Sequence, residues 1–230
     1  MKKPEGIFKG VNVYDEKTRA KPLSPEIQAE LSAAQDCFCL LSVSHYNYYR
    51  NFETLLRALA ILKQQSPESK FRLFLTCKFS SSENPGLYRA EGAAALVNRL
   101  GIRQEVVELG AVPYDQLHQL YRCCNVYVTA AYAESFAHPL VEAMASGLPV
   151  VASDIAVHRE ICDGAAVFFD RFSPEELAWQ IMKLTRSREE CQELSRRART
   201  RSLDFSWAKH AQELLKLANS LIFDRSFRPS

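Results

Sequence analysis

The sequence predicts an α/β fold built on a single Rossmann-like, doubly wound parallel sheet, with a helical segment at its carboxyl end. Short apolar runs that suit strands alternate along the chain with longer runs of helical periodicity. The short runs, such as residues 38–41, are apolar at successive positions rather than at alternate ones. Strands of a parallel sheet show such continuous apolar runs because helices cover both faces of the sheet.

The first expected helix follows a start signal at residues 24–26, a serine, a proline and a glutamate. The hydroxyl can cap the helix, the proline fits its first position, and the carboxylate faces the positive end of the helix dipole. We expect this helix to end near Ala33. Beyond it the sequence predicts strands at residues 38–44, 71–77, 106–109, 126–129, 150–153 and 167–169, separated by helices at residues 52–64, 87–100, 114–123, 140–146 and 158–161.

The carboxyl segment, residues 173–223, shows helical periodicity throughout. A second start signal, Ser-Pro-Glu-Glu at residues 173–176, opens it. An apolar stripe along these helices is expected from Phe205, Trp207, Leu214, Leu215 and Leu221.

Length and composition are those of a compact globular protein. The 230 residues allow one large domain or two small ones, at roughly 100 to 200 residues per domain. Hydrophobic residues make up 47% and charged residues 24%, which is ordinary globular usage. The order of the motifs favours one domain at residues 23–224, preceded by a tail or interdomain linker at residues 1–22 and followed by a tail at residues 225–230.

Charge and cysteine content exclude several classes of protein. Lys and Arg number 29 against 27 Asp and Glu, so no general affinity for nucleic acid or anionic membranes is expected. Every apolar run is shorter than the roughly 18 residues of a membrane span. A proline, a glutamate and a glycine at residues 4–6 interrupt what could otherwise be a signal peptide, which favours a cytoplasmic location. Seven cysteines without a Cys-x-x-Cys pair suit reduced thiols better than disulfides or a metal site.

Two common phosphate-binding motifs are missing from the sequence. No Gly-x-Gly-x-x-Gly follows an expected strand, and no Gly-Lys-Ser/Thr phosphate loop is present. Only 8 glycines occur in the chain. Nicotinamide-dependent dehydrogenases and P-loop ATPases are therefore not favoured, and a phosphate site here has to use a helix N-terminus with little glycine.

The segment at residues 127–153 carries the clearest chemical signal. It is predicted to run strand, loop, helix, strand, with Pro139 at the first helical position and Gly147 at the helix end. Its loop lies at the carboxyl end of a parallel strand, where open α/β sheets bind ligands. The free backbone N–H groups of Leu140, Val141 and Glu142 are expected to form an anion site.

Two carboxylates, Glu134 and Glu142, bracket this loop. Carboxylates accept hydrogen bonds from hydroxyl groups, so the pair suits a ligand with a sugar at one end of a pyrophosphate and a ribose at the other. The alternative is structural: Glu142 in the first helical turn offsets the helix dipole, and Glu134 caps the turn.

These residues resemble the retaining glycosyltransferases of the GT-B fold, specifically glycosyltransferase family 4. The family pattern is a Glu, seven intervening residues and a second Glu, embedded as in residues 134–151 of this chain. Residues 109–113 resemble the family's base-contacting loop, Ser153-Asp154 with Glu160 resembles the next strand and loop, and residues 205–207 look like the start of its closing helix. The resemblance covers roughly residues 11–221 and concerns only the C-terminal, donor-binding half of the fold.

The resemblance implies a role for each matching residue. Glu142 would hold the ribose hydroxyls, and Glu134 would be the catalytic carboxylate that faces the donor sugar. A basic pair, aligned with His45 and Arg50, would clamp the diphosphate, although His45 stands where Arg is usual and Ala137 where Gly is usual. The backbone around the diphosphate would come from Phe136, Ala137, His138, Pro139 and Leu140, and the base would contact the region of Val112 and Pro113.

The implied function is transfer of a sugar, of hexosyltransferase type, from a nucleoside-diphosphate sugar to an unknown acceptor, with retention of configuration. Arg50 and the helix N-terminus would stabilise the departing diphosphate, and Glu134 the positive charge at the anomeric carbon. No metal cluster is visible in the sequence, so neither a metal nor another cofactor is expected.

The length of the chain points to half of such an enzyme, because two Rossmann-like domains need roughly 350 to 400 residues. We expect an acceptor-binding domain to be encoded separately or within a longer product, and the chain alone to bind nucleotide-sugar weakly and transfer little. The alternative is a non-catalytic nucleotide-sugar-binding module or a truncated remnant; a nucleotide-sugar epimerase fits the motif less well. An apolar face without its second domain also predicts self-association.

Overall fold

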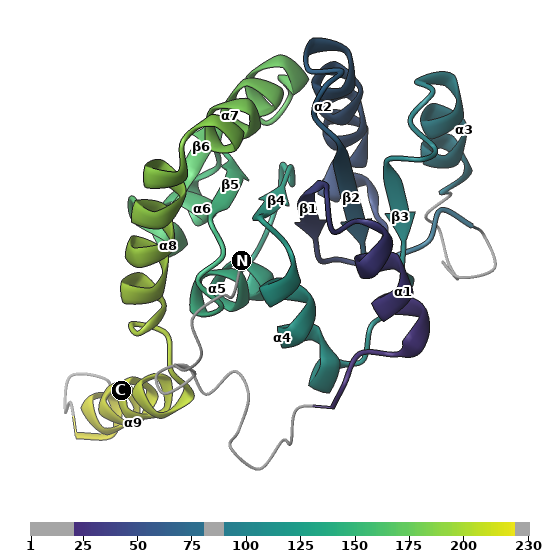
Figure 1. Ribbon diagram of the computed structural model, residues 1–230. Helices are drawn as coiled ribbons and strands as arrows, with labels where there is room; N and C mark the ends of the chain where they lie inside the picture. Colours follow the sequence, from purple (N-terminus) through teal and green to yellow (C-terminus); the bar gives the residue numbers. More distant parts are fainter. Residues whose placement is uncertain (1–20, 81–89, 224–230) are drawn as a thin grey trace.

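The computed structural model describes residues 21–80 and 90–223 and centres on a six-stranded parallel sheet (Figure 1). Its strand order is β3-β2-β1-β4-β5-β6, and every neighbouring pair is parallel. The predicted α/β, Rossmann-like class is confirmed. The strands are β1 (Phe38–Ser42), β2 (Phe71–Leu75), β3 (Val106–Glu108), β4 (Val126–Thr129), β5 (Val150–Ser153) and β6 (Val167–Phe169).

The direction of winding reverses between β1 and β4. From β1 the chain builds outward to β2 and β3, and then returns to place β4 on the other side of β1. Loops that leave two such strands diverge toward opposite faces of the sheet and open a crevice at the carboxyl edge, where α/β proteins bind ligands. The two loops at this point carry Arg50 and Glu134.

Helices alternate with the strands as the sequence predicts, with boundaries that shift by a few residues. Two predicted start signals are confirmed by their caps: Ser24 Oγ accepts a hydrogen bond from the N–H of Ile27, and Ser173 Oγ accepts one from the N–H of Glu176. The helices are α1 (Pro25–Ala33), α2 (Phe52–Gln65), α3 (Glu91–Arg99), α4 (Tyr114–Cys123), α5 (His138–Ala145), α6 (Ala156–Cys162), α7 (Pro174–Arg186), α8 (Arg188–Ser202) and α9 (Trp207–Phe223), with a 3₁₀ turn at Tyr48–Arg50.

The core has two parts, one on each face of the sheet. Leu40 belongs to a cluster that includes residues of α2, α3 and α7, whereas its neighbour Leu41 belongs to a cluster that includes residues of α1, α4 and α5. Successive strand residues thus feed opposite faces. This double coverage is the reason that the strands are apolar at most successive positions rather than at alternate positions.

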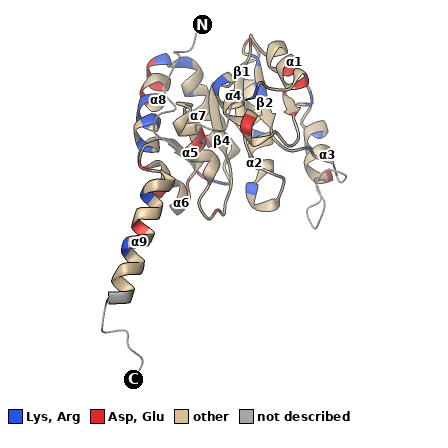
Figure 2. Ribbon diagram, turned by 90° about the horizontal axis from the view of Figure 1, so that it is seen from below, with Lys and Arg blue, Asp and Glu red and all other residues tan. Residues whose placement is uncertain are grey.

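The last helix, α9, differs from the expected packing. Phe205, just before it, is half-buried and packs against the core. The other members of the predicted apolar stripe, Trp207, Leu214, Leu215 and Leu221, are all exposed. Figure 2 shows the reason: α9 projects away from the body of the domain, so no layer of the described chain covers its apolar side chains.

The predicted tails lie almost entirely outside the described residues, as does the start of the helix predicted at residues 87–100. Of the first tail only residues 21 and 22 are described, and the N–H of Lys21 donates to the carbonyl of Asp115 at 3.1 Å. Within the described residues, no helix combines the length and the apolar character that crossing a membrane requires.

The turn after α5 depends on a glycine, so we predict that Gly147→Ala destabilises the fold. Gly147 has φ +69°, and a Cβ there would lie 2.0 Å from Nε of Arg199. Left-handed backbone costs a residue with a Cβ about 1–2 kcal/mol. The free energy of unfolding, measured by urea denaturation, should fall by about that amount.

The matched control is Gly92→Ala in α3, where an added Cβ meets nothing within 4 Å. Alanine favours a helix over glycine by about 0.8–1.0 kcal/mol, so this variant should be as stable as the original chain or more stable. Equal losses of stability in the two variants would contradict the conformational argument.

Candidate active site

The candidate site lies between the loops that follow β1 and β4. The first loop passes through residues 43–47 into the 3₁₀ turn at Tyr48–Arg50, and the second spans residues 130–137 before α5. The N–H of Tyr132 donates to the carbonyl of Tyr49 at 2.9 Å and ties the two loops together. Residues far apart in the sequence therefore meet at the carboxyl edge of the sheet.

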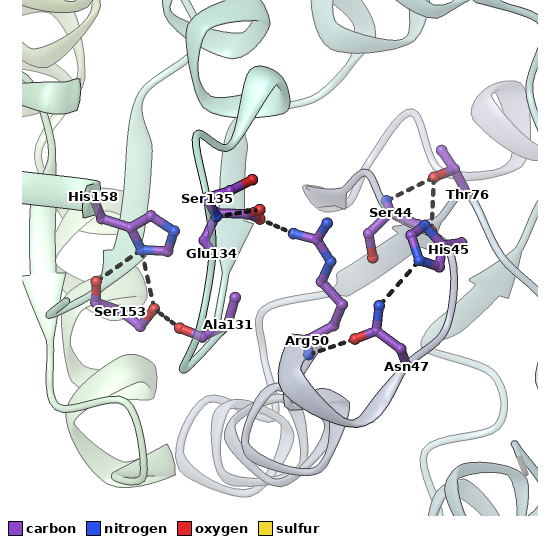
Figure 3. Close-up of polar contacts among 10 residues, drawn as sticks. All are labelled: Ser44, His45, Asn47, Arg50, Thr76, Ala131, Glu134, Ser135, Ser153 and His158. Atoms are coloured by element: carbon purple, nitrogen blue, oxygen red, sulfur yellow. Dashed lines mark hydrogen bonds and ion pairs between the residues drawn. The ribbon is translucent and has the colours of Figure 1, made fainter. Parts of the chain in front are cut away.

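Arg50 and Glu134 form a direct ion pair across these loops (Figure 3). Nη1 of Arg50 donates to Oε2 of Glu134, and the side chains are only 16% and 9% exposed. The N–H of Ser135 donates to the other carboxylate oxygen at 3.1 Å, while Oδ1 of Asn47 accepts from the N–H of Arg50 at 3.1 Å. The structure thus brings together the cation expected at a diphosphate and the carboxylate expected at a sugar.

His45, the other member of the expected basic pair, does not join this cluster. Its side chain is exposed, and its Nε2 lies 3.0 Å from Nδ2 of Asn47. Figure 3 shows the His45 ring turned toward Asn47 rather than toward Arg50. The amide of Asn47 holds both residues, with His45 on its nitrogen and the backbone of Arg50 on its oxygen, and so keeps the ring apart from the ion pair.

The start of α5 departs from the predicted anion site in two respects. The helix begins at His138, so Pro139 occupies the second helical position rather than the first. The N–H of Leu140, expected to be free, donates to the carbonyl of Ala137 at 2.9 Å. Ala137 is the cause, since its left-handed backbone (φ 60°, ψ 59°) turns the chain tightly into the helix.

Glu142 lies in the second turn of α5 and is 6% exposed. Oε2 of Glu142 accepts a hydrogen bond from the hydroxyl of Tyr121 at 2.8 Å. Burial raises the pKa of Glu142, while the Tyr121 hydrogen bond and nearby His138 act in the opposite direction. Because the side chain is beyond the first turn, offsetting the helix dipole does not explain it.

A cavity of about 760 Å³ adjoins Glu142. One wall comes from the start of α4, the loop before α5 and the first two turns of α5, and the other comes from α9 and the residues that lead into it. The neighbouring Val112 and Pro113, predicted near a base, do not line it, but Tyr114, the next residue, does. The lining residues are Tyr114, Phe136, His138, Val141, Glu142, Asp204, Phe205, Ser206, Trp207, Lys209, His210 and Glu213.

Two residues at the site were not found by sequence reasoning. Tyr121 contacts Glu142 across 21 positions of sequence, which no local pattern signals. The sequence places His158 only in a short helix, yet its side chain is 0% exposed and hydrogen-bonded to Ser153. Burial and the charge of Arg50 lower the pKa of His158, whereas the hydrogen bond to the Ser153 backbone and the charge of Glu134 raise it. Both members of the ion pair therefore act electrostatically on the ring. A histidine just after an apolar strand was the only available signal.

The described residues contain no group of three or more His, Cys, Asp or Glu side chains placed to hold a metal ion. The cysteines at positions 37, 39, 77, 123, 124, 162 and 191 are all free thiols.

The contact between Tyr121 and Glu142 makes stability depend on pH, and Tyr121→Phe should strengthen that dependence. Burial raises the pKa of Glu142 above its ordinary 4.5, so the folded state disfavours the carboxylate and loses stability as pH rises through this range. Loss of the Tyr121 hydroxyl raises this pKa further. The variant should be destabilised by about 1–3 kcal/mol at pH 7 and by less at pH 4, as measured by urea unfolding.

The control for this prediction is the same substitution in a Glu142→Gln background. If the carboxylate is responsible, the pH dependence of the Tyr121→Phe effect disappears there. A loss of stability that is the same at pH 4 and pH 7 in both backgrounds would contradict the assignment.

Known proteins are similar to this chain in sequence. D-inositol 3-phosphate glycosyltransferase from Nocardia farcinica is 30% identical over 175 residues, which cover 75% of this chain and 38% of that protein. Mannosylfructose-phosphate synthase from Agrobacterium fabrum is 29% identical over 175 residues, or 73% of this chain and 37% of that protein. The chain thus spans about two-fifths of the length of these curated relatives.

Solved structures share the fold at lower identity. HepE from Anabaena in complex with UDP matches with a TM-score of 0.73 at 20% identity, over 92% of this chain and 55% of that one. Sucrose-phosphate synthase from Thermosynechococcus elongatus matches with a TM-score of 0.74 at 22% identity, over 89% and 50%. The family model described as "Glycosyl transferases group 1" matches residues 24–201. Because that match takes in most of the chain, including β1 to β6 and both candidate carboxylates, this protein belongs to the group 1 glycosyl transferases.

Proposed function

We propose that this chain is the donor-binding half of a retaining, family 4 glycosyltransferase, which transfers a sugar from a nucleoside-diphosphate sugar. The observation that carries the proposal is the Arg50–Glu134 pair at the point where the strand order reverses. A guanidinium suits a diphosphate, and a carboxylate beside it suits the sugar attached to that diphosphate. Family membership supports the reaction type, while retention rests on the resemblance to family 4 alone.

Arg50 keeps hydrogen-bonding capacity for such a ligand. Only its Nη1 contacts Glu134, and its Nε is buried without a hydrogen-bond partner among the described residues. A guanidinium carries five N–H donors in a fixed plane, so a phosphate can bind while the carboxylate stays on one edge. In the proposed reaction Arg50 and the N-terminus of α5 stabilise the charge that develops on the departing diphosphate.

Glu134 and Glu142 would serve the two sugars of the donor. Glu134 is held by Arg50 and by the N–H of Ser135, and its carboxylate would orient the transferred sugar and favour positive charge at the anomeric carbon. Glu142 faces the cavity beside α5, where it would accept hydrogen bonds from the ribose hydroxyls. The cavity has room for a nucleoside, because small-molecule sites occupy about 300–1,000 Å³.

The proposal includes a separate acceptor-binding domain, on another chain or on a longer form of this protein. In a GT-B enzyme that domain closes the cleft and positions the acceptor, whose identity the proposal leaves open. A second candidate is a module that binds nucleotide-sugar without transferring it. The orientation of His45 favours this candidate, because among the described residues Arg50 is then the one member of the expected basic pair beside Glu134.

Calorimetry with UDP-, GDP- and ADP-glucose tests donor binding directly. We predict that the chain binds at least one of them and that Glu142→Ala weakens this binding about 10- to 100-fold, since hydrogen bonds to a charged group contribute about 1.5–3 kcal/mol. Glu193→Ala, which removes an exposed carboxylate on α8, is the control and should leave affinity unchanged. Equal affinity in the original chain and Glu142→Ala would refute the ribose role.

The diphosphate role of Arg50 predicts that Arg50→Gln affects charged ligands alone. The affinity for UDP should fall about 10- to 100-fold, because a cation is lost and the carboxylate of Glu134 is left beside the phosphates. The affinity for uridine should stay within about twofold. Arg57→Gln, which changes an exposed arginine on α2, is the matched control. A parallel loss for UDP and uridine would mean that Arg50 only supports the loops.

A further inference from the structure

His158 of α6 has one ring nitrogen fixed by the fold. Its Nδ1 lies 3.0 Å from the carbonyl oxygen of Ser153 and 3.1 Å from the Ser153 hydroxyl. The Ser153 hydroxyl in turn donates to the carbonyl of Ala131, at the start of the loop that carries Glu134. Because a carbonyl oxygen can only accept, Nδ1 must carry the proton. This assignment follows from the hydrogen-bond network.

The other ring nitrogen, Nε2, is therefore an acceptor with a free lone pair. Burial lowers the pKa of His158, which keeps the ring neutral near pH 7. Nε2 is buried, and none of the described residues donates a hydrogen bond to it. A buried acceptor without a donor destabilises the folded state, so its persistence in a folded protein calls for an explanation.

The position of this acceptor connects it to the candidate site. Figure 3 shows Nε2 of His158 directed toward the Glu134–Ser135 segment, with Arg50 on the far side of Glu134. The carboxylate and the guanidinium both act on the ring electrostatically. A second buried atom without a partner, the donor Nε of Arg50, lies on the opposite side of the same carboxylate.

The chemistry of the site restricts what can donate to Nε2. The carboxylate of Glu134 has no proton to offer when ionised, and the guanidinium of Arg50 lies on the far side of that carboxylate from the ring. A second cation beside Arg50 would be repelled. The remaining class is a small neutral donor, and hydroxyl groups are the donors that a sugar brings to a carboxylate-lined site.

We propose that Nε2 of His158 accepts a hydrogen bond from a hydroxyl group of the donor sugar, which makes His158 a specificity-determining residue. This inference rests on the proposed function, because it places the transferred sugar beside Glu134. Beside Glu134, whose side chain is 9% exposed, Ser135 and Phe136 are both exposed, so a ligand can reach this segment from solvent. When the diphosphate shares Arg50, the Glu134 side chain turns to the sugar and admits a hydroxyl to the ring.

The substitution His158→Asn separates this role from structural support. The amide nitrogen of asparagine takes the position of Nδ1 and can still donate to the Ser153 carbonyl, but nothing replaces Nε2. With the glucose nucleotide that binds best, we expect affinity to fall about five- to tenfold, the effect of one lost hydrogen bond. Affinity for the parent nucleoside diphosphate, which has no sugar beyond the diphosphate, should not change.

Two further variants complete the experiment. His158→Gln places an amide oxygen near the position of Nε2 and should keep part of the sugar-dependent affinity. This variant also provides the test if His158→Asn does not fold. Ser153→Ala removes the hydroxyl anchor and leaves Nε2 in place, so any loss should be equal for both ligands. Thermal unfolding of each variant confirms that a folded protein was measured.

The outcomes distinguish this inference from the proposed function. Equal losses for the nucleotide-sugar and the nucleoside diphosphate in His158→Asn would show that the ring only supports the loop, and no loss for either would show that it does not meet the ligand. Both results overturn the inference while donor binding stands. If the unmodified chain binds neither class of ligand, the proposed function itself fails, and the inference about His158 fails with it.

Discussion

The ion pair between Arg50 and Glu134 is the contact on which the geometry of the candidate site depends. It joins the loop after β1 to the loop after β4, two segments that diverge because the winding of the sheet reverses between these strands. With both side chains largely buried, either charge alone would carry a large desolvation cost, so each requires the other. The pair therefore fixes the loop that leads into α5, the helix that holds Glu142.

The same pair sets a condition on the binding of an anion. Opposite charges that neutralise each other in a partly buried site present little net field to a ligand, and a diphosphate must compete with a carboxylate for the guanidinium. The free Nε edge of Arg50 makes this exchange of partners easier, because a phosphate can bind there before the carboxylate leaves. Exchange of this kind would release Glu134 at the moment when the proposed sugar arrives next to it.

The fold could be predicted because its signals are local. Continuous apolar runs mark strands buried on both faces, and the serine caps at Ser24 and Ser173 mark helix starts whatever the tertiary context. Most failures lie where residues distant in the sequence decide the outcome, and one has a local cause. The hydroxyl of Tyr121 reaches Glu142 only because α4 and α5 pack together, and the exposure of Trp207 and its neighbours depends on the layer that covers α9 rather than on their own spacing. The backbone N–H of Leu140 is not free, because the left-handed backbone of Ala137 places its carbonyl as the acceptor. An alanine in the sequence does not indicate a positive φ, which glycine adopts far more readily.

Environment gives four polar groups of the site different hydrogen-bonding roles. Arg50 offers donors, Glu134 accepts as one member of an ion pair, Glu142 is a buried carboxylate steadied by Tyr121, and His158 is a neutral ring with its lone pair turned inward. Figure 3 places Glu134 between Arg50 and His158, while Glu142 lines the cavity beside α5. A nucleoside-diphosphate sugar carries the complementary groups, which are ribose hydroxyls, an anionic diphosphate and the hydroxyls of the transferred sugar. A free nucleotide would satisfy only the first two of these sets. If the proposed function holds, the acceptors beside Arg50 would therefore add recognition of the transferred sugar to that of the nucleotide.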